Sequence, residues 1–317
     1  MREHFSCRCK RASKSSGGFS LGKGHGKWIF APQSSRKNAG ASVLLIAAIA
    51  AILMVSGTAW GQAFNGMDRN DYPGDGLLGA LHKSFSYTSY WLNAPPGEKA
   101  TTWTGKRAVL KESGFGFMVL WNGRLDRDLK GAALKEMDAA SLGRNDAAAA
   151  VAAAEREGFP KGTLIFLDQE EGGRLLPEQL SYVLGWVDAV RRAAWRGGVY
   201  CSGLPVDDGS GGTITTAQDI ERQAGSWKIP LWVARDECPP SPGCVIEGKP
   251  RLPSSALGLP DAVVWQYALS PRRPEFTGGC PKNYATDNHC YAPGVYHGPY
   301  GFVDLDTAAS ADPSGGR

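Results

Sequence analysis

The sequence is poor in histidine, which restricts the metal chemistry that it could support. Five of its 317 residues are histidine, and those that follow residue 63 are His82, His289 and His297. No two of these stand at the spacing that places paired histidines on one face of a helix. The set Cys280, His289, Cys290 and His297 also lacks the usual spacing of zinc ligands. We therefore expect neither a metal site nor another cofactor.

The chain has no excess of one charge sign in its main part. The formal net charge is +4, but residues 1–63 carry nine Lys or Arg against the single acid Glu3. The rest of the chain holds 26 basic and 30 acidic side chains. Because the positive charge is confined to the N-terminal segment, it gives no indication of nucleic-acid binding.

Residues 1–63 have the features of an export signal. A basic stretch precedes a charge-free apolar run over residues 39–55, and small residues follow it. The small residues at the spacing of a signal peptidase site are Gly61 with Ala63, or Gly57 with Ala59. We expect an exported protein, whether periplasmic, cell-surface or secreted. The alternative is an uncleaved signal anchor, in which case this segment alone contacts the membrane.

Cysteines are few beyond the leader, and their positions agree with export. They are Cys201, Cys238, Cys244, Cys280 and Cys290. The pairs Cys238–Cys244 and Cys280–Cys290 each bracket a short segment, which predicts two disulfides that close local loops. Cys201 is left over at the end of an apolar run, and we expect it to be buried and free.

Short apolar runs alternate with helical segments after residue 63, as in a parallel sheet with crossover helices. The predicted strands are residues 64–68, 86–92, 116–121, 163–168, 198–202, 230–235, 262–267 and 301–306. The predicted helical segments are residues 76–84, 104–113, 145–157, 177–195 and 216–225. This order indicates one irregular (β/α)8 barrel of the TIM type over residues 64–307, followed by a disordered tail at 308–317. A doubly wound open sheet is the alternative, but no Gly-x-Gly-x-x-Gly motif follows the first strand.

Acidic residues stand at the predicted strand ends. Asp68 ends the first strand, Asp168 and Glu170 end the fourth, and Asp304 with Asp306 ends the eighth. The carboxyl ends of the strands meet at one mouth of such a barrel, where the chemistry takes place. Crowded carboxyl groups do not all ionise readily, so we expect one to keep a proton while another stays charged. Glycoside hydrolysis requires this division of roles.

Aromatic residues near the same strand ends offer flat apolar faces for sugar rings. The predicted substrate-binding residues are Trp121, Tyr200, Trp232, Trp265 and Tyr267. Trp91 also ends a predicted strand and offers such a face. Packing in the core is the alternative role for some of these side chains.

Six motifs at these strand ends carry a resemblance to a known family. They are GMDRND, FLDQEE, GVYCSG, LWVARD, VVWQY and GFVDLD, in this order along the chain. They resemble the motifs of the family 25 glycoside hydrolases, which are lysozyme-type muramidases of the (β/α) barrel class. They are closer still to the exported glycoside-hydrolase-like domain family related to those enzymes. The resemblance covers residues 64–307.

The resemblance assigns roles to individual residues. It implies that Glu170 is the proton donor and that Asp168 is its partner carboxylate. It matches Asp68 to the acid of the first strand and Asp304 to the acid of the last strand. The residues matched to the cleft wall are Trp265 and Tyr267.

Two departures from the muramidase pattern concern the substrate. The second predicted strand, residues 86–92, lacks an acidic ending, and Trp121-Asn122 stands where a Tyr-His pair is common. We therefore expect a glycosidase that acts on peptidoglycan or a related cell-envelope polysaccharide, without a commitment to muramic acid. The alternative is a barrel that binds envelope glycans without cutting them. A metal-dependent polysaccharide deacetylase is disfavoured because paired histidines are lacking.

The leader makes a direct prediction for the mature protein. We expect residues 1–63 to be absent after export, because the basic stretch, the apolar run and the small-residue exit together form a cleavable signal. Mass spectrometry of the exported protein measures this. An intact leader on that protein would favour the anchor.

Overall fold

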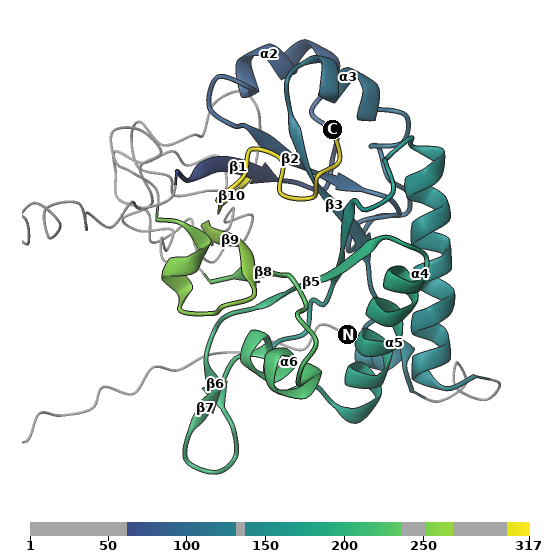
Figure 1. The fold of residues 1–317 in the computed structure, drawn as a ribbon, viewed down its shortest axis with the longest axis vertical. Helices are drawn as coiled ribbons and strands as arrows, with labels where there is room; N and C mark the ends of the chain where they lie inside the picture. Colours follow the sequence, from purple (N-terminus) through teal and green to yellow (C-terminus); the bar gives the residue numbers. More distant parts are fainter. Residues whose placement is uncertain (1–61, 131–136, 236–251, 269–302) are drawn as a thin grey trace, which may run out of the picture. The chain divides into compact units, whose positions relative to one another are not determined.

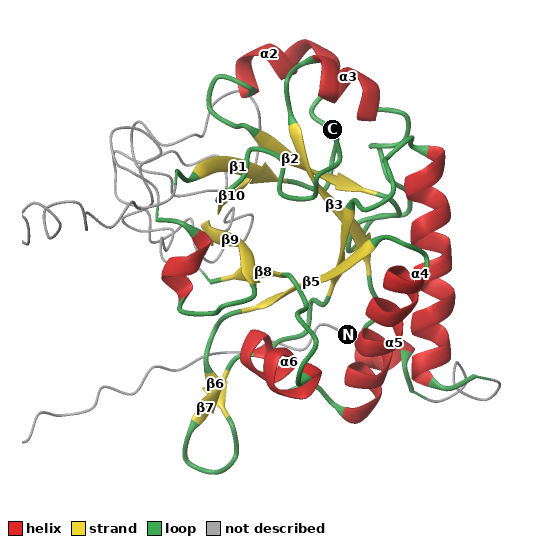
Figure 2. Cartoon of the chain, in the orientation of Figure 1, coloured by secondary structure: helices red, strands yellow, loops and turns green. Residues whose placement is uncertain are grey.

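Eight strands close into a barrel in the part of the chain that the computed structural model describes (Figures 1 and 2). The described residues are 62–130, 137–235, 252–268 and 303–317. The barrel strands are β1 (Phe64–Asp68), β2 (Tyr87–Trp91), β3 (Gly116–Asn122), β4 (Leu164–Asp168), β5 (Arg196–Ser202), β8 (Leu231–Ala234), β9 (Ala262–Ala268) and β10 (Asp304–Ala308). They follow chain order around the barrel, and β10 closes it against β1. The predicted barrel of eight strands is therefore confirmed.

Helices occupy each of the five segments predicted to be helical. They are α2 (Leu78–Leu81), α3 (Arg107–Glu112), α4 (Ala139–Arg156), α5 (Pro177–Arg192) and α6 (Thr216–Ala224). Shorter elements are the 3₁₀ turns η1 (Asp75–Leu77), η2 (Asp126–Asp128) and η4 (Ser254–Leu257), and the hairpin strands β6 (Val206–Asp207) and β7 (Thr213–Ile214). Helix α4 begins earlier than predicted because Asp138 caps it, its carboxylate accepting a hydrogen bond from the Ser141 amide.

The two longest helices, α4 and α5, lie side by side outside the barrel (Figure 2). Glycine on each helix allows this close approach. A Cβ atom on Gly143 would lie 2.3 Å from the carbonyl oxygen of Tyr182, and one on Gly185 would lie 2.6 Å from that of Ala140. Both distances are far below van der Waals contact, so a larger residue at either position would push the helices apart.

The last strand runs in the opposite direction to the others. β10 is antiparallel to both β1 and β9, whereas the remaining strand pairs of the barrel are parallel. The sequence analysis took Asp304 and Asp306 as the end of the last strand, and this was wrong: Asp304 begins it. Because the strand is reversed, its first residue still lies at the mouth, where Asp304 is paired with Asp68.

Aromatic side chains fill the barrel below its mouth. The ring of Trp232 packs edge-on against Phe166, with centroids 5.7 Å apart, and both side chains are fully buried. Gly66 leaves room for Tyr87, because a Cβ atom there would lie 1.9 Å from the tyrosine ring. The described side chains beneath the mouth thus form a packed core.

The residues after β10 do not form the disordered tail that the sequence predicted (Figure 1). Ser314 is fully buried at the start of β3 and β4. Its amide donates to the Phe117 carbonyl at 2.9 Å, and its carbonyl accepts from the Leu164 amide at 2.8 Å. Its hydroxyl oxygen accepts from the Val119 amide at 3.0 Å. The segment therefore supplies hydrogen-bond partners to both strands.

Several predictions from the sequence fall outside the described residues. These are the leader up to residue 61 and the four cysteines of the two predicted disulfides. Cys201 is buried in β5 and free, as expected. Within the described ranges, no helix is both long and apolar enough to span a bilayer.

We predict that Ser314→Ala lowers the free energy of unfolding by about 1–3 kcal/mol, because it leaves the buried Val119 amide without an acceptor. Urea unfolding followed by circular dichroism measures the change. Ser310→Ala is the matched control in the same segment, since Ser310 is exposed, and we expect a change within about 0.5 kcal/mol. Equal effects of the two variants would contradict the buried role of Ser314.

Candidate functional site

A pocket of about 120 Å³ opens at the mouth of the barrel. Its lining among the described residues is Asp68, Asn70, Trp91, Pro96, Leu120, Asp168, Glu170, Tyr200 and Asp304. All four acids predicted to be catalytic are in this set, together with the predicted substrate-binding residue Tyr200. Asn70, Pro96 and Leu120 were not foreseen, and Trp91 had been left out of the binding set.

The sheet explains why the acids converge. In the parallel ladder Asp168 is level with Asn122 on β3 and with Tyr200 on β5, so it stands at the rim between two neighbouring strands. β4 ends at Asp168, but the chain stays close to the rim because the Gln169 amide donates to the Tyr200 carbonyl at 3.0 Å. Glu170 therefore reaches the same pocket from just beyond the strand.

Asp168 is buried in the wall of the pocket. Its side chain is 2% exposed, and apart from the neighbouring carboxyl of Glu170, no group in the described chain hydrogen-bonds to its carboxyl oxygens. Burial, followed by the negative charges of Glu170 and Asp68, raises the pKa of Asp168 well above its usual value. The environment of Asp168 thus favours its protonated form.

Glu170 has a different environment from Asp168, although the two are adjacent in the pocket. Glu170 is exposed, so its carboxyl group is accessible to a ligand that enters from solvent. The pair therefore combines a buried carboxyl group with an accessible one, and the negative charge of Glu170 contributes to the raised pKa of Asp168.

A further acid, Asp306, lies deeper in the barrel and does not line the pocket. It is fully buried, and its Oδ1 accepts a hydrogen bond from Nε1 of Trp232 at 2.9 Å. Burial, then the charges of Asp68 and Asp304, raise the pKa of Asp306 well above its usual value. The charge of Asp68 thus contributes to the raised pKa of both Asp168 and Asp306.

Gln266 connects two sides of the pocket and was missed by the sequence analysis. Its Oε1 accepts a hydrogen bond from the Tyr200 hydroxyl at 2.8 Å, and its Nε2 donates to Oδ2 of Asp304 at 3.4 Å. Gln266 is 1% exposed. The motif VVWQY contained the signal, because a glutamine within an apolar strand needs hydrogen-bond partners once it is buried.

The predicted aromatic residues divide between the pocket and the core. Trp232 is fully buried beneath the pocket, where its ring packs against Tyr200 with centroids 5.0 Å apart. The residues absent from the described lining are Trp121, Trp232, Trp265 and Tyr267. Trp91 lines the pocket instead, held by a hydrogen bond from its Nε1 to the Arg69 carbonyl at 3.1 Å. Tyr200 and Trp91 are thus the described aromatic faces of the site.

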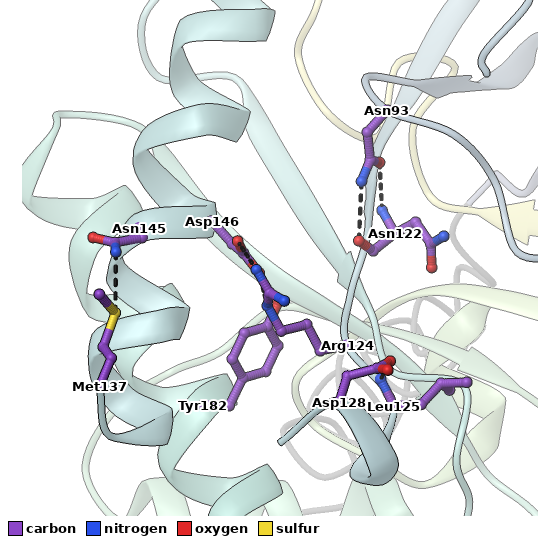
Figure 3. A network of polar contacts seen from close by, with 9 residues as sticks. All are labelled: Asn93, Asn122, Arg124, Leu125, Asp128, Met137, Asn145, Asp146 and Tyr182. Carbon is purple, nitrogen blue, oxygen red and sulfur yellow. Dashed lines mark hydrogen bonds and ion pairs between the residues drawn. The ribbon is translucent and has the colours of Figure 1, made fainter. Parts of the chain in front are cut away.

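Polar contacts hold the loops that follow β2 and β3 (Figure 3). The Asn122 amide donates to Oδ1 of Asn93 at 2.7 Å, and Nδ2 of Asn93 donates to the Asn122 carbonyl at 3.1 Å. Arg124 forms a two-pronged ion pair with Asp146 on α4, at 2.7 and 2.9 Å, and the Tyr182 hydroxyl on α5 donates to the same carboxylate at 2.8 Å. This network anchors the mouth to the outer helices.

Glu171 has a structural role distinct from that of Glu170. Its carboxylate accepts hydrogen bonds from the Asp126 amide at 2.7 Å and from Nε2 of Gln179 at 2.5 Å. It therefore connects the end of β4 to η2 and to the first turn of α5. No group of three or more His, Cys, Asp or Glu side chains suited to a metal ion occurs among the residues that the structure describes.

We predict that the folded protein becomes less stable as pH rises, because the buried carboxyl group of Asp168 then loses its proton. Its pKa is raised on folding, so its stabilising contribution is complete below its ordinary pKa of 3.8 and is lost as pH rises through the folded-state pKa. The free energy of unfolding in urea should fall less between pH 4.5 and pH 8 for Asp168→Asn than for the wild type. At pH 8 the variant should have the higher free energy of unfolding. The control Asp71→Asn, at an exposed aspartate, should follow the wild type. Parallel curves for all three proteins would contradict the burial argument.

Comparisons with known proteins agree with this architecture. Residues 92–237 match the model of the family described as "Rv2525c-like, glycoside hydrolase-like domain". No curated protein sequence matches the chain. Among solved structures, an uncharacterised B. stearothermophilus protein has a TM-score of 0.50 and 17% identity, covering 77% of this chain and 95% of its own. That similarity supports the fold.

Two further solved structures are similar at lower scores. The Tat-secreted protein Rv2525c of Mycobacterium tuberculosis, in complex with L-tartrate, has a TM-score of 0.44 and 14% identity over 78% of this chain and 94% of its own. The modular autolysin LytC of Streptococcus pneumoniae has a TM-score of 0.44 and 12% identity over 77% of this chain and 46% of its own.

The matched range contains Asp168, Glu170 and Tyr200, whereas Asp68 and Asp304 reach the same pocket from outside it. The resemblance inferred from the strand-end motifs is thereby confirmed: residues 92–237 match the model of the Rv2525c-like glycoside hydrolase-like domain.

Proposed function

We propose that this protein is an exported glycosidase that cleaves peptidoglycan or a related cell-envelope polysaccharide by carboxylate acid/base catalysis. One observation carries the proposal. Asp168 and Glu170 line one pocket with Asp68 and Asp304, and they combine a buried acid of raised pKa with an accessible one. This is the arrangement in which one acid supplies a proton while others stabilise positive charge.

Each acid has a role in this proposal. Glu170 donates a proton to the glycosidic oxygen, because it is the accessible member of the pair. Asp168 is the partner carboxyl, and its burial in the pocket wall favours its protonated form. Asp68 and Asp304 face each other across β1 and β10 and place negative charge beside the developing oxocarbenium ion.

Aromatic side chains and the leader support an envelope glycan as the ligand. Trp91 and Tyr200 line the pocket and offer apolar faces for a sugar ring. The leader predicted at residues 1–63 would deliver the protein to the cell envelope. Rv2525c, after which the matched family model is named, is a Tat-secreted protein. The ligand would therefore be a polysaccharide outside the cytoplasm.

A non-catalytic glycan-binding barrel is the second candidate, and two observations favour it. β2 ends in Trp91 and brings no acid to the pocket. Asn122, which stands where muramidases commonly have histidine, uses its side chain to donate to the Ala94 carbonyl at 2.8 Å. Its amide is therefore committed to the loop and supplies no proton for catalysis.

We predict that Glu170→Gln lowers the turnover of envelope polysaccharide by at least about a hundredfold, because the amide keeps the shape of the side chain but has no acidic proton. Release of reducing ends from purified peptidoglycan measures turnover. The affinity for glycan, measured by calorimetry, should change little because the amide still forms hydrogen bonds.

Glu178→Gln is the matched control, since Glu178 lies in the first turn of α5 and outside the described pocket lining. We expect it to retain wild-type turnover. Full activity of Glu170→Gln would remove Glu170 from the proton-donor role. A wild-type protein that binds glycan but cleaves no envelope polymer would favour the binding barrel.

A further inference from the structure

Gln266 is the polar residue that links the aromatic and acidic sides of the pocket. Tyr200 on β5 donates its hydroxyl proton to Oε1 of Gln266 at 2.8 Å, and Nε2 of Gln266 donates to Asp304 on β10 at 3.4 Å. Both partners line the pocket, whereas Gln266 lies behind them and is 1% exposed. Gln266 therefore affects a ligand only through Tyr200 and Asp304.

The direction of these hydrogen bonds follows from the chemistry of the groups. An ionised carboxylate only accepts hydrogen bonds, so Asp304 requires the NH₂ group of the amide. The amide oxygen of Gln266 then faces Tyr200 and requires a donor. Burial, together with the negative charges of the surrounding acids, raises the pKa of Tyr200 well above its usual value, so its hydroxyl keeps the proton that it donates.

A β-bulge sets the position of Gln266 relative to β10. Leu305 is paired with Ala268, but the next residue of β10, Asp306, is paired with Gln266, which leaves Tyr267 as an extra residue in β9. A bulge changes the direction in which neighbouring side chains point, and bulges are frequent beside active sites. The bulge therefore lies beside the contact between Gln266 and Asp304.

We propose that Gln266 is a positioning residue that fixes the Tyr200 hydroxyl as a hydrogen-bond acceptor toward the ligand and holds Asp304 in place as a charged group. Because the hydroxyl proton of Tyr200 is directed at Gln266, the oxygen of Tyr200 presents its lone pairs to the pocket. The group of the glycan that it receives is then a donor, either a sugar hydroxyl or the N–H of an N-acyl group. This inference rests on the proposed glycan function of the same pocket.

The experiment compares three variants with the wild type. Gln266→Met keeps the length of the side chain but removes both hydrogen bonds, and Tyr200→Phe removes the hydroxyl alone. Gln266→Glu is the conservative variant, because a protonated carboxyl can still accept from Tyr200 and donate to Asp304, whereas an ionised one repels Asp304. The described charged or titratable groups near this position are Tyr200, Asp304, Asp306, Asp68, Arg235, Asp168 and Glu170.

Two measurements are made at pH 5 and at pH 8. One is kcat and KM on solubilised peptidoglycan fragments, and the other is binding of triacetylchitotriose by calorimetry. Thermal unfolding at both pH values checks that each variant is folded. We expect Gln266→Met to bind triacetylchitotriose at least about tenfold more weakly at both pH values, from loss of an oriented hydrogen bond. The affinity of Gln266→Glu for triacetylchitotriose should be within about threefold of the wild-type affinity at pH 5. At pH 8 it should fall to the affinity of Gln266→Met.

A double-variant cycle separates positioning from a general loss of structure. If Gln266 acts through Tyr200, the combined variant Gln266→Met/Tyr200→Phe should bind about as weakly as Gln266→Met alone. The proposal would be overturned if the losses of binding free energy in the two single variants added up in the double variant. It would also be overturned if Gln266→Glu lost the same affinity at pH 5 and at pH 8. A wild-type protein that binds triacetylchitotriose but does not cleave any fragment would reject the proposed hydrolysis, while the binding cycle would still test Gln266. Absence of both binding and cleavage would reject both.

Discussion

The pairing of Asp68 with Asp304 across β1 and β10 is the constraint on which the site depends. Like charges placed directly opposite each other in a sheet oppose pairing of the strands, yet this pair closes the barrel. The rest of the barrel must therefore supply enough packing to hold two acids together. The buried rings of Phe166, Tyr87 and Trp232 beneath the mouth provide such packing. The fold is stable despite its site rather than because of it.

The carboxyl groups near the mouth of the barrel are buried to different degrees. Asp306 is fully buried beneath the pocket, Asp168 is buried in its wall, and Glu170 is exposed at its opening. The preference for the neutral form is strong for both buried groups, because desolvation penalises their ionised forms. The carboxylate of Glu171, the next residue after Glu170, accepts hydrogen bonds that hold a loop. Adjacent acids of one short segment thus differ in position, since one lines the pocket and the other connects loop and helix.

The sequence was sufficient to predict the strands and the convergence of the acids, because apolar runs that end in Asp or Glu are local features. It did not reveal the reversal of β10, since a short strand has the same composition in either direction. Most of the aromatic residues were misplaced for a related reason. Side chains alternate between the two faces of a strand, and Leu120, the neighbour of Trp121, is the β3 residue that lines the pocket. The buried position of Ser314 depends on contacts with strands far away in the chain, which composition does not encode.

The closure of the barrel has a consequence for the synthesis of the chain. Among the described barrel strands, β1 is the first to leave the ribosome and its partner β10 is the last, so one edge of β1 stays unpaired until β10 has been made. Contacts between residues so distant in sequence form slowly, because a long loop must be ordered first. An unpaired strand edge also invites association with other chains. Until β10 emerges, the nascent protein therefore has an open sheet edge that a chaperone can bind.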